Sequence, residues 1–166
     1  PQCLVIAQHC SESKPNVLLL RKLGLTQTQA QKFLAAEHIE SDLRWLGQQE
    51  NALIACDDPR YPEKLKNIAN PPAVLFVKGN TECLSQTQIA IVGSRRYSDY
   101  GETCATYFSS ELSAAGLVIT SGLALGIDGI AHRACLETQG TTIAVLGCGI
   151  AQIYPACHEH LASRIV

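Results

Sequence analysis

Two short turns carry the residues in this chain that are best suited to chemistry. The first is GSRR at 93–96, which follows the apolar run 89–92, and the second is SGLALGID at 121–128, which follows 117–120. Backbone N–H groups at such turns and at helix N-termini bind phosphate well. Two adjacent arginines add charge and paired donors for phosphate oxygens. The sequence therefore predicts a phosphate-bearing ligand at this surface.

The glycines of the second turn have two interpretations. Gly122, Gly126 and Gly129 either let a ligand approach the backbone closely or serve only the tight turns themselves. Their spacing differs from the G-x-G-x-x-G fingerprint of dinucleotide-binding proteins. Thr120-Ser121 also occupies the position where an NAD site has an acidic residue that binds the ribose. No Gly-Lys-Ser/Thr sequence is present, so the chain has no Walker A motif.

The charged and aromatic residues near the turns also have alternatives. The arginine pair either binds phosphate or is simply solvated, and Tyr97 and Tyr100 either stack on bases or form cleft walls. Asp128 either complements its helix dipole or orients Arg95 or Arg96 by ion pairing. His132, one turn later on the same helix face, is expected to be packed or hydrogen-bonded rather than catalytic.

The sequence favours binding over catalysis. It contains no G-x-S-x-G elbow, no nucleophile–base pair and no pair of carboxylates at the strand ends. Cys148, Cys157, His158 and His160 are metal-ligating types, but their spacing fits no common structural zinc site. We therefore expect neither a metal nor a cofactor.

Composition narrows the class of protein. The chain has 166 residues, of which 46% are hydrophobic and 17% charged, as in an ordered globular protein. The net charge of −2 excludes a bulk electrostatic attraction to nucleic acid, so anion binding must come from a few placed groups. No apolar run approaches the roughly 18 residues of a membrane span. The eight cysteines form no C-x-x-C pair, which is typical of reduced thiols in a cytoplasmic protein.

The sequence pattern around the two turns predicts alternating strands and helices. Apolar strands are expected at 89–92, 117–120 and 142–146, with helices between them, and the first strand should be covered on both faces. Strands joined in this way are parallel with right-handed crossovers. A strand at 73–78 is a candidate fourth member. The fold class predicted is α/β, a partial Rossmann-like parallel sheet.

A small helical module precedes the sheet. Thr26 and Gln29 have capping-box spacing, and Ser41 is a candidate cap for a further helix in which Leu43 and Leu46 point inward. The LGLT turn fits either a helix-hairpin-helix contact with DNA or plain packing. We predict an all-α domain over 1–52 and the sheet domain over 53–166.

Several linked motifs resemble one family. In this order and spacing, IAIVGSRRYSDYG, LVITSGLALGIDGIAH and TIAVLGCGIAQIYP resemble the DNA-processing protein A family, also called DprA or Smf. The upstream DDPRYPEKLKNIANPPAVLFVKGN is similar to that family's lead-in, and the helical module to its SAM-like, helix-hairpin-helix-type domain. The resemblance covers the chain from about residue 17 onward.

The resemblance implies a function. Proteins of this family bind single-stranded DNA in bacterial natural transformation, protect incoming strands and help to load the RecA recombinase, as cytoplasmic homodimers that hydrolyse no nucleotide. It also implies which residues bind DNA phosphate. They are Gly93, Ser94, Arg95, Arg96, Ser121, Gly122, Ala124, Gly126 and Asp128.

The family pattern continues beyond this chain. After Tyr154-Pro155 the family has further strands, DNA contacts and its dimer surface, so this chain is expected to bind DNA weakly and not to dimerise in the family manner. One alternative is a nucleotide-processing enzyme of the phosphoribohydrolase type, for which Asp128 is the only candidate carboxylate in the glycine-rich turns. Another is an interaction module whose helical part contacts a protein.

Overall fold

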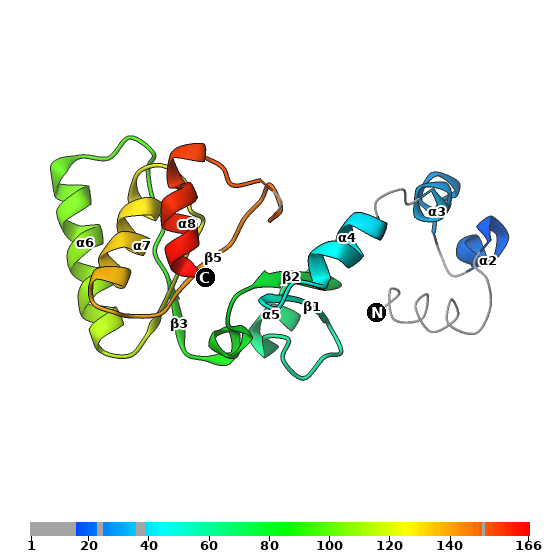
Figure 1. The fold of residues 1–166 in the computed structure, drawn as a ribbon, viewed down its shortest axis with the longest axis horizontal. Helices are drawn as coiled ribbons and strands as arrows, with labels where there is room; N and C mark the ends of the chain where they lie inside the picture. Colours follow the sequence, from blue (N-terminus) through cyan, green and yellow to red (C-terminus); the bar gives the residue numbers. More distant parts are fainter. Residues whose placement is uncertain (1–15, 23–24, 36–38, 151) are drawn as a thin grey trace. The chain divides into compact units, whose positions relative to one another are not determined.

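The computed structural model describes residues 16–22, 25–35, 39–150 and 152–166 (Figure 1). The chain forms two compact units, Pro1–Gln49 and Glu50–Val166. In the described part of the chain, no helix is long and apolar enough to cross a membrane.

The first unit is helical where it is described. Its helices are α2 (Val17–Lys22), α3 (Gln27–Leu34) and α4 (Ile39–Leu46). Leu20 of α2 and Ala30 of α3 are fully buried against each other, which makes a very small core. Assignment of this unit to the SAM-like class stays a prediction.

The helix starts in this unit confirm one prediction and correct another. The capping box at Thr26 and Gln29 is present. Ser41 does not cap α4, because that helix already begins at Ile39. Leu43 is 60% exposed rather than pointing inward, since the small core of this unit leaves much of its apolar surface in water.

Thr26→Ala is expected to destabilise α3 by about 1 kcal/mol, since it removes the side chain that caps the helix. The Gln29 N–H donates to Thr26 Oγ1 at 3.3 Å, and the Thr26 N–H donates to Gln29 Oε1 at 2.9 Å. Urea denaturation followed by helical circular dichroism measures the loss. Thr28→Ala removes the same atoms from an exposed position inside α3, so an equal loss in both variants would contradict a capping role.

The second unit opens with a two-stranded antiparallel sheet. Strand β1 (Asn51–Ala55) pairs with β2 (Val74–Lys78), with Leu53 opposite Phe76. Between them lies α5 (Glu63–Lys66), and after them the 3-10 helix η1 (Thr81–Ser85). The prediction that 73–78 extends the parallel sheet is therefore wrong, because that strand finds its hydrogen-bonding partner in β1.

A three-stranded parallel sheet follows and confirms the α/β fold class. Its strands are β3 (Gln88–Ala90), β4 (Val118–Ser121) and β5 (Thr142–Ala144), in the spatial order β3-β4-β5. Both pairings are parallel. The connections are α6 (Asp99–Ala114) and α7 (Ile127–Glu137), and the chain closes with η2 (Ala156–His158) and α8 (Glu159–Ile165).

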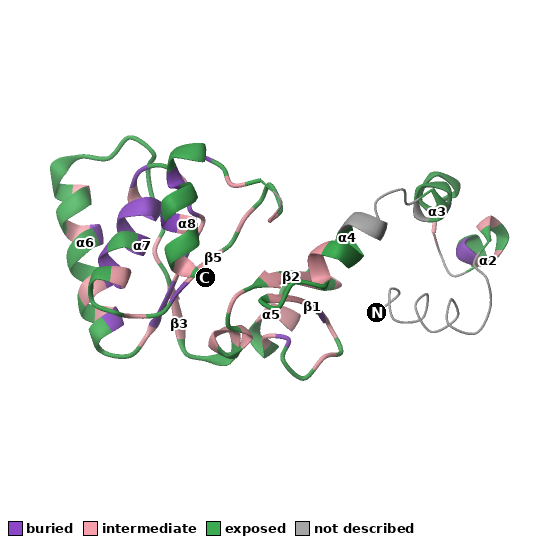
Figure 2. Cartoon of the chain, viewed as in Figure 1, coloured by how far each residue is buried: buried purple, intermediate pink, exposed green. Residues whose placement is uncertain are grey.

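Helices α6 and α7 cover one face of this sheet. Ile119 of β4 packs with Ala131 and Cys135 of α7 in a fully buried cluster, and Leu112 of α6 packs against it. Figure 2 shows buried residues concentrated along α7. On the other face Val92 is 70% exposed and Val145 62% exposed. The prediction that the first strand is covered on both faces is therefore wrong for this chain.

Candidate functional site

The two predicted turns touch each other beyond the ends of β3 and β4. Gly126 has φ +83°, and a Cβ atom there would lie 2.8 Å from the Cα atom of Arg95. The Ile127 N–H donates to the carbonyl of Ser94 at 3.2 Å. Only glycine permits this conformation and this approach. The fold thus joins two segments that are about thirty residues apart in the sequence.

The other glycines of these turns serve the packing of the protein itself. A Cβ atom on Gly93 would lie 2.7 Å from Ile127 Cγ1. A Cβ atom on Gly122 would lie 2.7 Å from Asp128 Oδ2. A side chain at either position would meet protein atoms. The geometry therefore favours the interpretation that these glycines serve the tight turns, and not the interpretation that they let a ligand approach the backbone.

Asp128 supports the second turn and does not pair with an arginine. Its side chain is nearly buried, at 7% exposure, and its Oδ2 accepts the Gly122 N–H at 3.0 Å. In the described ranges the ion pairs are Arg60–Asp58 and Lys66–Glu63. The interpretation that Asp128 orients Arg95 or Arg96 by ion pairing is therefore wrong, since the carboxylate is already held by a backbone amide.

Two predicted serines also bind backbone. Ser121 is buried, and its hydroxyl donates to the carbonyl of Ile91 at 2.6 Å, which ties the end of β4 to the segment after β3. The Ser94 hydroxyl donates to the carbonyl of Arg96, and its oxygen accepts the Arg96 N–H at 3.1 Å. Both side chains shape the turns from within.

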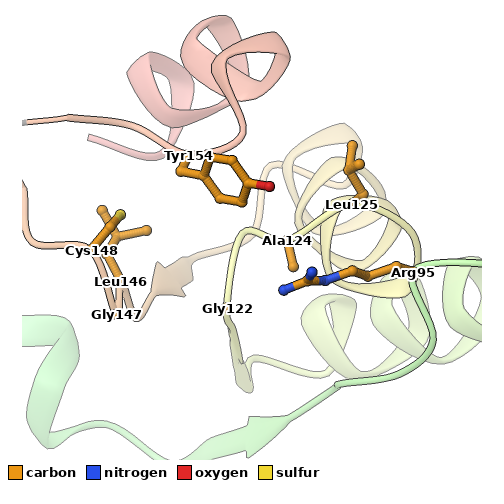
Figure 3. Close-up of a pocket in the computed structure, with 8 residues that line it drawn as sticks. All are labelled: Arg95, Gly122, Ala124, Leu125, Leu146, Gly147, Cys148 and Tyr154. Atoms are coloured by element: carbon orange, nitrogen blue, oxygen red, sulfur yellow. The ribbon is translucent and has the colours of Figure 1, made fainter.

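A cavity of about 210 Å³ opens beside the turns (Figure 3). Arg95 reaches into it from the first turn, and Tyr154 directs its ring toward the same space from the segment before α8. Arg95 is the only charged side chain in its lining among the described residues. The lining consists of Arg95, Gly122, Ala124, Leu125, Leu146, Gly147, Cys148 and Tyr154.

The cavity contains part of the predicted set. Arg95, Gly122 and Ala124 line it, whereas the other predicted residues support the turns or, like Arg96, lie outside the lining. Tyr97 and Tyr100 are exposed and also lie outside it. A hydrogen bond with Cys104 raises the pKa of Tyr100.

Most of the lining residues that sequence reasoning missed come from the segment that follows the third strand of the parallel sheet. Leu146, Gly147 and Cys148 follow β5 as the two turns follow β3 and β4. The rule that ligands bind at the carboxyl ends of parallel strands could have found them. For Tyr154, nothing in the sequence except its place in the family motif could have predicted that it lines the cavity.

Backbone donors of the second turn lie next to this cavity. Within the part of the chain that the structure describes, the N–H groups of 123–126 donate no hydrogen bond to protein. The Leu123 residue has φ +56°, an uncommon conformation for a residue with a side chain. Free amides in such a turn, beside a guanidinium, are suited to an anion.

The two histidines near the turns are structural. His132 is fully buried, and its Nδ1 lies 2.7 Å from Thr142 Oγ1. Burial lowers the pKa of His132 to about 4. The expectation that His132 is packed and hydrogen-bonded is confirmed. His158 is bonded to the carbonyl of Leu123, and the described residues include no cluster of three or more His, Cys, Asp or Glu suited to a metal.

The arrangement of these groups is better suited to binding an anion than to catalysing a reaction of that anion. The cavity combines one cation, unpaired amides, an aromatic ring and apolar walls, without a carboxylate among its described lining residues. Asp128, the only candidate carboxylate in the glycine-rich turns, accepts the Gly122 N–H and does not line the cavity. Phosphoribohydrolase-type chemistry therefore has no support in this geometry.

Comparison with known proteins identifies relatives over most of the chain. The family model described as DNA recombination-mediator protein A matches residues 52–166. Protein Smf of Escherichia coli is 43% identical over 157 residues, which cover 93% of this chain and 42% of that protein. DNA processing protein DprA of Bacillus subtilis is 42% identical over 113 residues, 68% of this chain and 38% of that protein. The chain thus spans about two fifths of the length of these relatives.

Solved structures show the same fold. The X-ray structure of DNA processing protein A from Streptococcus pneumoniae superposes with a TM-score of 0.76 at 29% identity, covering 99% of this chain and 58% of that one. DNA processing protein A from Helicobacter pylori, studied for its single-stranded DNA binding mode, matches with a TM-score of 0.62 at 29% identity. That match covers 70% of this chain and 51% of the other.

Proposed function

This chain belongs to the DNA recombination-mediator protein A family, and from that premise we propose that it binds single-stranded DNA through the cavity beside its two turns. Arg95 contacts a phosphate, and the unpaired amides of the second turn bind oxygens of the same or the next phosphate. The observation that carries the proposal is Arg95, the one cation among the described lining residues, placed in a cavity beside backbone N–H groups that donate to no described protein group.

The size of the cavity supports an extended ligand rather than a free small molecule. Small-molecule sites usually enclose about 300–1,000 Å³, and this cavity has about 210 Å³. It therefore has room for one unit of a chain, such as a phosphate or one base. The ring of Tyr154 offers a surface on which a base can stack.

The low net charge of the chain supports a mode of DNA binding that relies on a few local contacts with phosphates. At −2 the chain offers no general attraction for DNA, so affinity must come from a few phosphates. Each phosphate contact on a single strand contributes about 0.7 to the salt dependence of log K. We expect a shallow salt slope for this chain.

The roles of the whole protein are a further part of the proposal. We infer that the full-length protein protects single strands, helps to load RecA onto them and acts as a cytoplasmic homodimer. The family assignment and the Helicobacter pylori relative, whose single-stranded DNA binding mode was studied, support this proposal.

Arg95→Ala is expected to weaken binding to single-stranded DNA by roughly 1–3 kcal/mol, because a charge-assisted contact with phosphate is lost. Fluorescence anisotropy of a labelled oligo-dT, at low and moderate salt, measures the change. Arg96→Ala is the matched control, because it removes the same charge from the neighbouring exposed position outside the cavity.

A comparable loss in both variants would mean that charge alone matters and that the cavity is not the site. If neither variant affects a parent that does bind, the DNA contacts lie elsewhere. A lack of binding by the parent would direct the same test to the full-length protein, and a lack of binding there would contradict the proposed function.

A further inference from the structure

We propose that His158 is a positioning residue of the cavity: it holds the Leu123 carbonyl, so that the N–H of Ala124 is presented to the ligand. The inference rests on the proposed function, because it concerns how the phosphate-binding turn is kept in shape. His158 itself does not line the cavity.

The contact joins two distant segments. His158 is 7% exposed, and its Nδ1 lies 2.9 Å from the carbonyl oxygen of Leu123. A carbonyl oxygen can only accept, so the imidazole donates its Nδ1–H. The segment that begins α8 thereby fixes one peptide group of the turn that begins α7.

The imidazole occupies a space left by a glycine. A Cβ atom on Gly129 would lie 2.7 Å from Cε1 and 3.0 Å from Nε2 of the His158 ring. Gly129 lies inside α7, where glycine is unfavourable for a helix. Because any side chain at this position would displace the ring, the local disadvantage of glycine is explained by the contact that it permits.

Holding the carbonyl determines where the next amide points. The Leu123–Ala124 peptide is trans, so its C=O and N–H point to opposite sides. The side chain of Leu123 is fully buried, which anchors the residue, and its φ of +56° is an uncommon conformation for a residue with a side chain. With the carbonyl directed at His158, the Ala124 N–H is directed away from it, and Ala124 lines the cavity.

Asp128 holds a second peptide group of the same turn, two peptides earlier. Its carboxylate accepts the Gly122 N–H, while His158 donates to the Leu123 carbonyl. The two side chains thus fix the first and the third of three consecutive peptide groups from the protein side. Donors fixed before the ligand arrives bind an anion better than donors that must first be ordered.

Three substitutions in the 166-residue chain test the inference. His158→Ala removes the donor, and His158→Asn keeps one, because the asparagine amide can occupy the place of Nδ1. Gly129→Ala leaves His158 in the chain but displaces its ring. His160→Ala is the control at an exposed histidine of the same segment.

Each variant is measured in three ways: oligo-dT anisotropy, hydrogen–deuterium exchange of the peptide over 118–128, and thermal midpoint. We expect His158→Ala and Gly129→Ala to weaken DNA binding by about fivefold, as for one lost hydrogen bond. We also expect faster exchange of the Gly122 and Ile127 amides, which are hydrogen-bonded in the turns. His158→Asn should restore both properties, and His160→Ala should change neither.

The outcomes separate this inference from the proposed function. If neither this chain nor the full-length protein binds oligo-dT, the proposed function fails, and the exchange data alone decide whether His158 orders the turn. The inference is overturned if His158→Ala binds and exchanges like the parent. It is also overturned if His158→Asn loses as much DNA affinity as His158→Ala. A Gly129→Ala variant that has a higher thermal midpoint but unchanged DNA binding and amide exchange would overturn it as well.

Discussion

Replacing Gly126 with alanine is expected to lower the free energy of unfolding of the second unit by about 3 kcal/mol. Two costs add: a strained backbone conformation of about 1–3 kcal/mol and overpacking of similar size. Gly126 has φ +83°, and its Cβ would lie 2.8 Å from the Cα and 2.9 Å from the carbonyl oxygen of Arg95. These are backbone atoms, so the collision cannot be relieved by rotating a side chain.

Urea denaturation of the parent and the variant measures this loss. Gly116→Ala is the matched control, since Gly116 has φ +85° but a Cβ there would meet nothing within 4 Å. The control therefore carries the backbone strain without the collision. Equal losses in the two variants would show that the collision with Arg95 adds nothing to the cost of the strained backbone conformation.

Stability is expected to fall by about 3 kcal/mol as the pH is lowered from 6.5 to 4, because His132 is buried in its neutral form. Burial is the main cause of its lowered pKa of about 4, with smaller contributions from His158 and Arg133, while Asp128 opposes them. The unfolded chain binds a proton near pH 6.5 and the folded chain only near pH 4. The contribution is therefore complete above pH 6.5 and is lost as the pH falls toward 4.

The tautomer of His132 explains why protonation is costly. The Thr142 hydroxyl donates to the carbonyl of Ile119 at 2.7 Å and so must accept from His132 Nδ1–H. His132 Nε2 is buried and has no hydrogen-bond partner among the residues that the structure describes. A proton on Nε2 would place a charge in a buried position without an acceptor.

Urea denaturation at pH 7.5, 5.5 and 4.5 measures this effect. His132→Gln keeps a polar side chain that does not titrate, so its stability should depend less on pH over this range. His160→Gln, at an exposed position, should keep the pH dependence of the parent. An unchanged pH dependence in His132→Gln would show that another group is responsible.

Features that depend on neighbours along the chain were predictable from the sequence alone. The parallel strand–helix units and the capping box at Thr26 follow from apolar runs, capping residues and glycine turns within a few residues. The two turns at the strand ends follow from the same pattern, and their motifs identified the family. Local patterning was sufficient here because each of these elements is specified by its own segment.

Only the tertiary structure decided which groups meet. It paired β2 with β1 instead of the parallel sheet, and it left Val92 exposed. It placed the Asp128 carboxylate on a backbone amide rather than on an arginine, and it brought His158 to Leu123 across 35 residues. Strand partners, the burial of a carboxylate and the occupant of the space beside a glycine depend on long-range contacts. The spacing of residues along a chain does not encode such contacts, so the cavity itself, and the long-range contacts that shape it, could be seen only in the folded protein.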